Sequence, residues 1–90
     1  MITVLTNAIV TAYIATGNPC ADRKMPRVGI TCAVPRGFPL GCKVIIAGHE
    51  YIGQDRTAKK YDGRFDIFFP DKKSAMEFGL QHKTITVITK

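Results

Sequence analysis

Two aspartates, Asp55 and Asp66, are the residues of this 90-residue sequence whose type and spacing favour acid–base chemistry. Asp55 ends a run with strand character, and Asp66 lies inside a second such run, residues 64–69. The polar, basic connection between them closes with Asp62 and Gly63, a turn signal, so the second strand can return Asp66 to the neighbourhood of Asp55. Two carboxylates at close range repel when both are ionised, so one keeps its proton to a higher pH, as a general acid requires.

The same two residues also have a structural interpretation. In that interpretation one aspartate anchors a loop, and the other caps backbone amides at the mouth of a barrel. Perturbed acidic residues occur in structural networks as well as in active sites, so local sequence leaves both interpretations open.

The strands and turns that must position the two aspartates follow from short runs of Val, Ile, Thr, Tyr and Phe bounded by Gly, Pro and Asn. Two apolar runs separated by Asn7 fill residues 2–14, of which 8–14 is the better strand. A hairpin turn is expected at Gly48 and His49. A short helix is expected to begin at Pro70 and Asp71 and to end at Gly79. The further strands are expected at residues 28–33, 42–47, 50–54, 64–69 and 83–89.

These elements predict a mainly β fold of about six strands and one short helix, in a single domain over residues 1–90. An open antiparallel sheet of this size would leave two exposed edges, so a small closed barrel is the simplest architecture. Hydrophobic residues make up 46% of the chain, which is typical of a folded protein.

The formal net charge of +6 favours an anionic partner: nucleic acid, an anionic membrane surface or a cell-wall polymer. Aromatic residues do not alternate with the basic ones as in a base-stacking platform, so nucleic acid is the least favoured of these. No apolar run approaches the roughly 18 residues of a membrane span. Residues 1–16 lack a basic n-region and are interpreted as strand rather than as a secretory signal, which predicts a cytoplasmic or virion-associated protein until its release.

Three cysteines, Cys20, Cys32 and Cys42, are an odd number without a C-x-x-C motif. With His49 or His82 they have no familiar spacing of zinc ligands, so no metal and no other cofactor is predicted. We expect reduced, apolar thiols, although one disulfide remains open.

The order of short motifs resembles the three-aspartate domain of the double-psi β-barrel superfamily. That group includes the catalytic domain of membrane-bound lytic transglycosylase A, cell-wall proteins of the stationary-phase survival type and, more distantly, rare lipoprotein A. The matching segments are Thr11-Ala12-Tyr13, Ala33-Val34-Pro35, Phe38-Pro39-Leu40-Gly41-Cys42, Asp55, Gly63-Arg64-Phe65-Asp66 and residues 75–79. The resemblance covers nearly the whole chain and implies a small six-stranded double-psi β-barrel with one short helix near the C-terminus.

Two departures from the family pattern concern the site. The aspartate of the Ala-Val-Asp-Pro segment is absent, because Val34 runs directly into Pro35. The glycine-rich loop is replaced by residues 56–60, Arg-Thr-Ala-Lys-Lys. The resemblance therefore carries two of the three aspartates, Asp55 and Asp66.

The resemblance implies cleavage of the β-1,4 bond after N-acetylmuramic acid in peptidoglycan. Asp66 would be the general acid, and Asp55 would raise its proton affinity or stabilise an oxocarbenium-like transition state. The candidate substrate-binding residues are Tyr13, by stacking on a sugar, and Arg56, Lys59, Lys60 and Arg64, by contact with carboxylates. Arg64 beside Asp66 would also lower its pKa. The alternative is a non-catalytic glycan-binding or virion-associated barrel, and either one is compatible with a phage origin.

Overall fold

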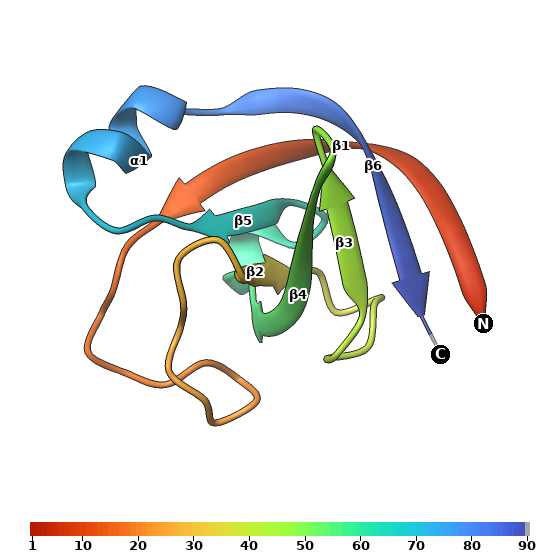
Figure 1. Ribbon diagram of the computed structural model, residues 1–90, viewed down its shortest axis with the longest axis horizontal. Helices are drawn as coiled ribbons and strands as arrows, with labels where there is room; N and C mark the ends of the chain where they lie inside the picture. Colours follow the sequence, from red (N-terminus) through yellow and green to blue (C-terminus); the bar gives the residue numbers. More distant parts are fainter. Residues whose placement is uncertain (90) are drawn as a thin grey trace.

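Strands are the main regular elements of this computed structural model, which describes residues 1–89. The strands are β1 (Ile2–Tyr13), β2 (Thr31–Val34), β3 (Lys43–Ile46), β4 (His49–Arg56), β5 (Phe65–Phe68) and β6 (Gln81–Thr89). They close into a barrel in the order β1-β5-β2-β4-β3-β6 (Figure 1). The 3₁₀ turn η1 (Lys59–Tyr61) precedes β5, and the helix α1 (Lys72–Phe78) precedes β6.

The strand pairings repeat between the two halves of the chain. β1 pairs parallel with β5, and β4 pairs parallel with β2. β1 pairs antiparallel with β6, and β4 pairs antiparallel with β3. If β1, β2 and β3 trade places with β4, β5 and β6 in that order, every parallel pair becomes a parallel pair and every antiparallel pair an antiparallel one. The predicted fold class, a mainly β closed barrel of six strands with one short helix near the C-terminus, is confirmed within residues 1–89.

The core lies inside the barrel and draws buried side chains from β1, β2, β3, β5 and β6, while Tyr51 of β4 is partly buried and packs against them. These side chains alternate along the strands with outward-facing ones, as a barrel requires. Its buried members are Val10, Cys32, Val34, Cys42, Val44, Ile46, Phe65, Ile67, Ile85 and Val87. All three cysteines are buried and free, in agreement with the expected reduced thiols.

The first strand is longer than the sequence indicated. β1 continues through Asn7 without interruption, because Asn7 pairs with Thr84 of β6 and its side-chain oxygen accepts a hydrogen bond from the Thr84 hydroxyl at 2.8 Å. The cross-strand partner thus satisfies the amide that would otherwise favour a turn. β1 and β6 form a long curved ribbon with both chain ends at one side of the molecule (Figure 1).

Three further boundaries differ from the expected ones. β2 begins at Thr31 rather than at residue 28. The hairpin turn consists of Ala47 and Gly48, both at positive φ, so His49 already pairs with Ile46 across the ladder. β4 runs on to Arg56, which places Asp55 inside a strand rather than after one.

The helix α1 has the predicted ends. The side chain of Asp71 accepts a hydrogen bond from the Ser74 amide at 2.8 Å, which is the N-cap arrangement, and Gly79 follows the last turn. Phe78 packs against Phe69 with ring centroids 5.1 Å apart, which fixes the helix beside the end of β5. In residues 1–89 no helix has the length and apolarity to cross a membrane.

Candidate acid site on the barrel wall

Four residues from four neighbouring strands form a row across the barrel wall: Thr11, Asp66, Ala33 and Asp55. Thr11 is in register with Asp66, Asp66 with Ala33, and Ala33 with Asp55. Residues in register on adjacent strands project to the same face, so the four side chains point the same way. Since strands lie about 4.8 Å apart, the backbones of Asp55 and Asp66 are separated by roughly 10 Å. The side chain between the two carboxylates is a single methyl group.

The four positions of the row are equivalent in pairs between the two halves of the chain, but the residue types at equivalent positions differ. The exchange of the two chain halves maps Asp66 onto Ala33 and Thr11 onto Asp55, because these are the corresponding members of the repeated pairings. One half thus presents a carboxylate at the centre of the row, where the other half presents a methyl group.

Asp66 is half-buried, and its surroundings act on its proton in both directions. The pKa of Asp66 is raised above its ordinary value, first by burial and then by the negative charge of Asp55. The Thr11 hydroxyl donates a hydrogen bond to Asp66 Oδ1 at 2.9 Å, and the guanidinium of Arg64 lies nearby; both stabilise the carboxylate and lower the pKa. The effects that raise the pKa of Asp66 outweigh those that lower it, and a general acid needs a raised pKa.

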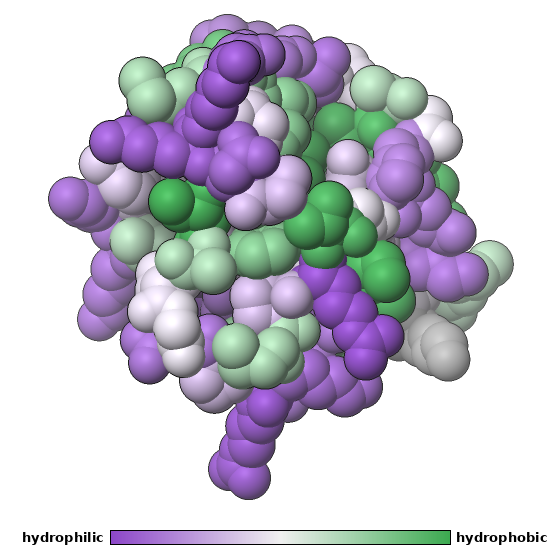
Figure 2. Space-filling model, turned by 60° about the vertical axis from the view of Figure 1, so that its left-hand side comes forward, coloured by the Kyte–Doolittle hydropathy of each residue, from purple (hydrophilic) through white to green (hydrophobic). Residues whose placement is uncertain are grey.

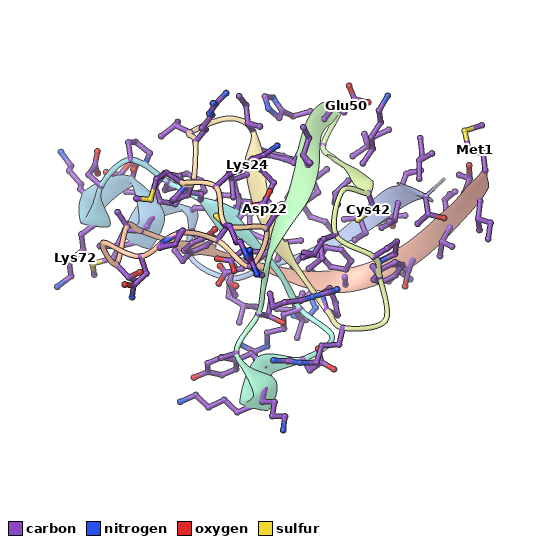
Figure 3. All side chains as sticks on the ribbon, turned by 90° about the horizontal axis from the view of Figure 1, so that it is seen from below. Met1, Asp22, Lys24, Cys42, Glu50 and Lys72 are labelled. Carbon is purple, nitrogen blue, oxygen red and sulfur yellow. The ribbon has the colours of Figure 1, made fainter. Side chains whose placement is uncertain are left out.

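Asp55 has a structural function in the loop that joins β1 to β2. Its Oδ1 accepts hydrogen bonds from the amides of Ala21 at 3.0 Å and Arg56 at 2.9 Å. Next to it, the Gln54 side chain donates to Asp22 Oδ2 at 3.1 Å, and the Asp22 amide donates to the Gln54 carbonyl. In Figure 3 the loop around Asp22 and Lys24 runs beside β4. The loop-anchoring interpretation of Asp55 is therefore supported by its contacts, whereas its charge still acts on Asp66.

A pocket of about 360 Å³ opens at Asp66. Its walls come from the end of β1, from the connection between β4 and β5, and from the start of β5. The lining residues are Thr11, Ala12, Thr57, Ala58, Tyr61, Arg64 and Asp66. Asp55 is not one of them. Asp66 and Arg64 thus lie at a cavity that a ligand can enter, and Asp55 lies at the end of the row, against the loop.

Tyr61 is a site residue that the sequence analysis did not single out. It is 44% exposed, and its ring lies 5.0 Å from Lys60 Nζ and 4.8 Å from Arg64 Cζ. Cations at this distance are attracted to the ring and hold it in place at the pocket. The available signal was an aromatic residue in an otherwise polar, basic loop, where nothing in the local pattern requires one.

The basic residues predicted to bind substrate have different surroundings. The Arg56 guanidinium donates hydrogen bonds to the carbonyl oxygens of Pro35 and Phe38, so it holds the loop that precedes β3. Lys59 and Lys60 are exposed on η1, which projects away from the barrel (Figure 3). Arg64 lines the Asp66 pocket. Arg64 and Lys60 therefore lie closest to the cavity, and Arg56 has structural partners.

Tyr13 lies on β1 two residues beyond Thr11, on the same face of the strand. Its ring meets Phe68 edge-on with centroids 5.4 Å apart, and its hydroxyl is buried without a hydrogen-bond partner. Burial, followed by the negative charge of Asp55, raises the pKa of Tyr13 far above its ordinary value, so the phenol stays neutral. Tyr13 thus packs beside the acid row and does not line the Asp66 pocket.

A second, shallower groove lies between the end of β1 and α1, and Tyr13, Met76 and Leu80 are among its lining residues. Met76 is 70% exposed and Leu80 52%. Figure 2 brings the left-hand side of Figure 1, where α1 lies, to the front and shows hydrophobic side chains surrounded by projecting hydrophilic ones. Among residues 1–89, no group of three or more His, Cys, Asp or Glu side chains is arranged to hold a metal ion.

One curated protein is similar in sequence, and its name concerns the bacterial cell wall. It is the "Putative cell wall shaping protein YabE" of Bacillus subtilis, which is 30% identical over 86 residues. The match covers 86% of this chain and 21% of that protein, so the chain spans about a fifth of the relative's length. No family model matches the sequence, and no solved structure matches it.

Proposed function

We propose that this chain is a cell-wall glycan domain of the three-aspartate, double-psi type, and that Asp66 is its general acid. The observation that carries the proposal is the position of Asp66, a carboxyl group with raised proton affinity at the wall of an open pocket. The name of the similar Bacillus subtilis protein and the closed six-stranded barrel support the cell wall as the place of action.

The proposed reaction is that of a lytic transglycosylase on the β-1,4 bond after N-acetylmuramic acid. Protonated Asp66 donates its proton to the glycosidic oxygen, and the bond from that oxygen to C1 of the muramic acid breaks. The C6 hydroxyl oxygen of the same sugar bonds to C1, and its proton passes to the Asp66 carboxylate. The product carries a 1,6-anhydro ring, no water is consumed, and Asp66 ends in its starting protonation state.

Asp55 acts in this scheme from a distance. Its ionised carboxylate disfavours a second negative charge on Asp66, so Asp66 holds its proton to a higher pH. Asp55 Oδ1 accepts hydrogen bonds from the Ala21 and Arg56 amides, which hold the carboxylate in place. Asp55 is thus a positioning and electrostatic residue rather than a second proton donor.

The pocket supplies two further contacts for a sugar polymer that carries carboxylates. The exposed ring of Tyr61 offers an apolar face for a pyranose ring. The guanidinium of Arg64 offers a fork of donors for a carboxylate, and Lys59 and Lys60 on η1 add charge at the rim. In this arrangement the saccharide lies between η1 and the end of β1, over Asp66.

The test is incubation of the purified protein with insoluble peptidoglycan, followed by mass analysis of the soluble products. Anhydro-muropeptides are expected from the wild-type protein, and none from Asp66→Asn. Reducing muropeptides in place of anhydro products would replace the transglycosylase mechanism with hydrolysis. Absence of both kinds of product would remove the enzymatic function.

A non-catalytic glycan-binding domain is the second candidate, and two observations favour it. The family's third aspartate is absent at Val34-Pro35, and the described hydrogen bonds of Asp55 serve the backbone of a loop. A pull-down on insoluble peptidoglycan distinguishes the two. Retention that persists unchanged in Asp66→Asn, without soluble products from the wild-type protein, supports binding alone.

A further inference from the structure

The first half of β1 has a free edge. β1 pairs with β6 along residues 2–10, but its pairing with β5 begins only at Val10. The carbonyl of Tyr13 points toward β5, since it accepts a hydrogen bond from the Phe69 amide at 2.8 Å. Backbone groups of every second residue of a strand point the same way, so those of Thr3, Leu5 and Asn7 point along the open side.

No described backbone partner occupies this side. Within residues 1–89, the backbone hydrogen bonds outside the regular ladders do not involve residues 2–12. One weak local contact reaches the edge, from the Thr6 hydroxyl to the Asn7 carbonyl at 3.4 Å. Leu5 is 70% exposed and Ile2 62% exposed, so apolar side chains accompany the unpaired backbone.

The free edge lacks the features by which proteins prevent strands from pairing with another chain. Charged side chains, prolines and bulges serve that purpose. Residues 2–14 contain no charged residue and no proline, and the register with β6 is continuous from Ile2 to Val10. By contrast, β3, β4, β5 and β6 each carry at least one ionisable side chain.

We propose that this edge pairs with the same edge of a second copy of the chain, as an antiparallel β1–β1 contact about a two-fold axis. An antiparallel pair of identical strands is self-complementary, because each strand offers the other the donors and acceptors that it needs. Two copies repel each other, because each carries a net charge of +6. An edge without charged side chains adds no further repulsion at the contact itself. Pairing through residues 2–9 of β1 brings no charged side chains opposite each other.

The contact uses a different part of β1 from the acid site. The Asp66 pocket is lined by the C-terminal part of β1, residues 11 and 12, which pairs with β5. A dimer formed this way holds the two pockets on one continuous sheet, as a polymeric substrate can exploit.

Sedimentation equilibrium across a wide range of protein concentration tests the proposal. The wild-type chain is expected to show a monomer–dimer equilibrium. Leu5→Pro removes one outward-pointing amide without removing a bond to β6, and Leu5→Lys places two cations near the two-fold axis. Each is expected to raise the dimer dissociation constant by about tenfold or more. Leu5→Thr keeps the amide and the strand propensity and serves as the matched control for the backbone contact.

A wild-type chain that stays monomeric at every concentration would overturn the proposal. So would a folded Leu5→Lys variant that dimerises as tightly as the wild type, because the contact would then lie elsewhere. Circular dichroism checks folding in each case. If Leu5→Pro does not fold, the comparison of Leu5→Lys with the wild type and with Leu5→Thr still decides the question.

Discussion

Asp55 and Asp66 lie opposite the same residue, Ala33, from the two strands that flank β2. The alanine keeps the two carboxylates on one face of the barrel wall without direct contact, so they interact through charge rather than through a shared proton. Asp66 then has a cavity in front of it, and Asp55 has a loop behind it. This division of tasks leads to predictions that separate the two acids.

Removing the Asp66 carboxyl group is expected to abolish glycan cleavage without loss of the fold. In Asp66→Asn the side chain keeps its size and its oxygen for the Thr11 hydroxyl, but the amide has no proton to donate at this step. Soluble anhydro-muropeptides should disappear while the circular dichroism spectrum is retained. In the wild type, product formation should increase as the pH falls toward the raised pKa of Asp66. A rate that rises steadily with pH through the acid range would contradict the acid role.

The stability of the same variant should depend on pH in a defined direction. Because the folded-state pKa of Asp66 is raised, its contribution to stability is fully present below the unfolded value of about 3.9 and is lost as the pH rises through the folded pKa. Asp66→Asn cannot ionise and avoids this loss. Relative to the wild type, its unfolding free energy should therefore improve from acid to neutral pH in denaturant titrations. If the unfolding free energy of Asp66→Asn instead fell relative to the wild type from acid to neutral pH, the folded environment would stabilise the Asp66 carboxylate.

The Thr11 hydroxyl is expected to tune the acid rather than to build the fold. In the wild type, the hydrogen bond from the Thr11 hydroxyl to Asp66 Oδ1 favours the ionised carboxylate. Thr11→Val has nearly the same shape but removes this hydrogen bond. The pKa of Asp66 should rise further, and the high-pH limb of the pH–rate profile, where the rate falls as Asp66 loses its proton, should move to higher pH. Thr11→Ser retains the hydroxyl and is the matched control. Identical profiles for Thr11→Val and the wild type would exclude the coupling.

Asp55 should affect stability and the Asp66 proton separately. Asp55→Ala leaves the Ala21 and Arg56 amides without their carboxylate, and a destabilisation of about 1–3 kcal/mol is expected from denaturant midpoints. Asp55→Asn keeps an acceptor and should cost less. It removes the negative charge, however, and should therefore lower the pKa of Asp66. Amide exchange at Ala21 reports the loop, and the position of the high-pH limb of the rate profile reports the charge. If Asp55→Ala were as stable as the wild type, the anchoring role would be wrong.

Tyr61 is expected to contribute to glycan binding through its ring and not through its hydroxyl. Tyr61→Ala removes the exposed aromatic face at the pocket and should weaken binding to soluble glycan fragments by roughly two- to tenfold, from about 0.5–1.5 kcal/mol of ring contact. Tyr61→Phe should bind as the wild type does. Fluorescence or calorimetric titration measures both. Equal loss in the two variants would point to the hydroxyl and against stacking.

Local patterns in the sequence determined the elements of this fold. The Asp71 cap and Gly79 bound α1, and the alternation of residues 83–89 marks β6, because caps and periodicity act over a few neighbouring residues. Six strands in a short chain then required closure, since an open sheet would leave two edges. The expected return of Asp66 to Asp55 across one turn, by contrast, did not include β2, which lies between β4 and β5 and separates the two aspartates.

Register and partners were decided only by the tertiary structure. Nothing near Asp66 in the sequence indicates that Thr11 will donate to it, because the contact depends on the parallel alignment of β1 with β5. The long β1, continuous through Asn7, likewise depends on Thr84 at the other end of the chain. Such contacts join segments that are distant in sequence, and they are selected by the closure of the barrel as a whole. The acid site is therefore a property of the register, and its residues alone do not define it.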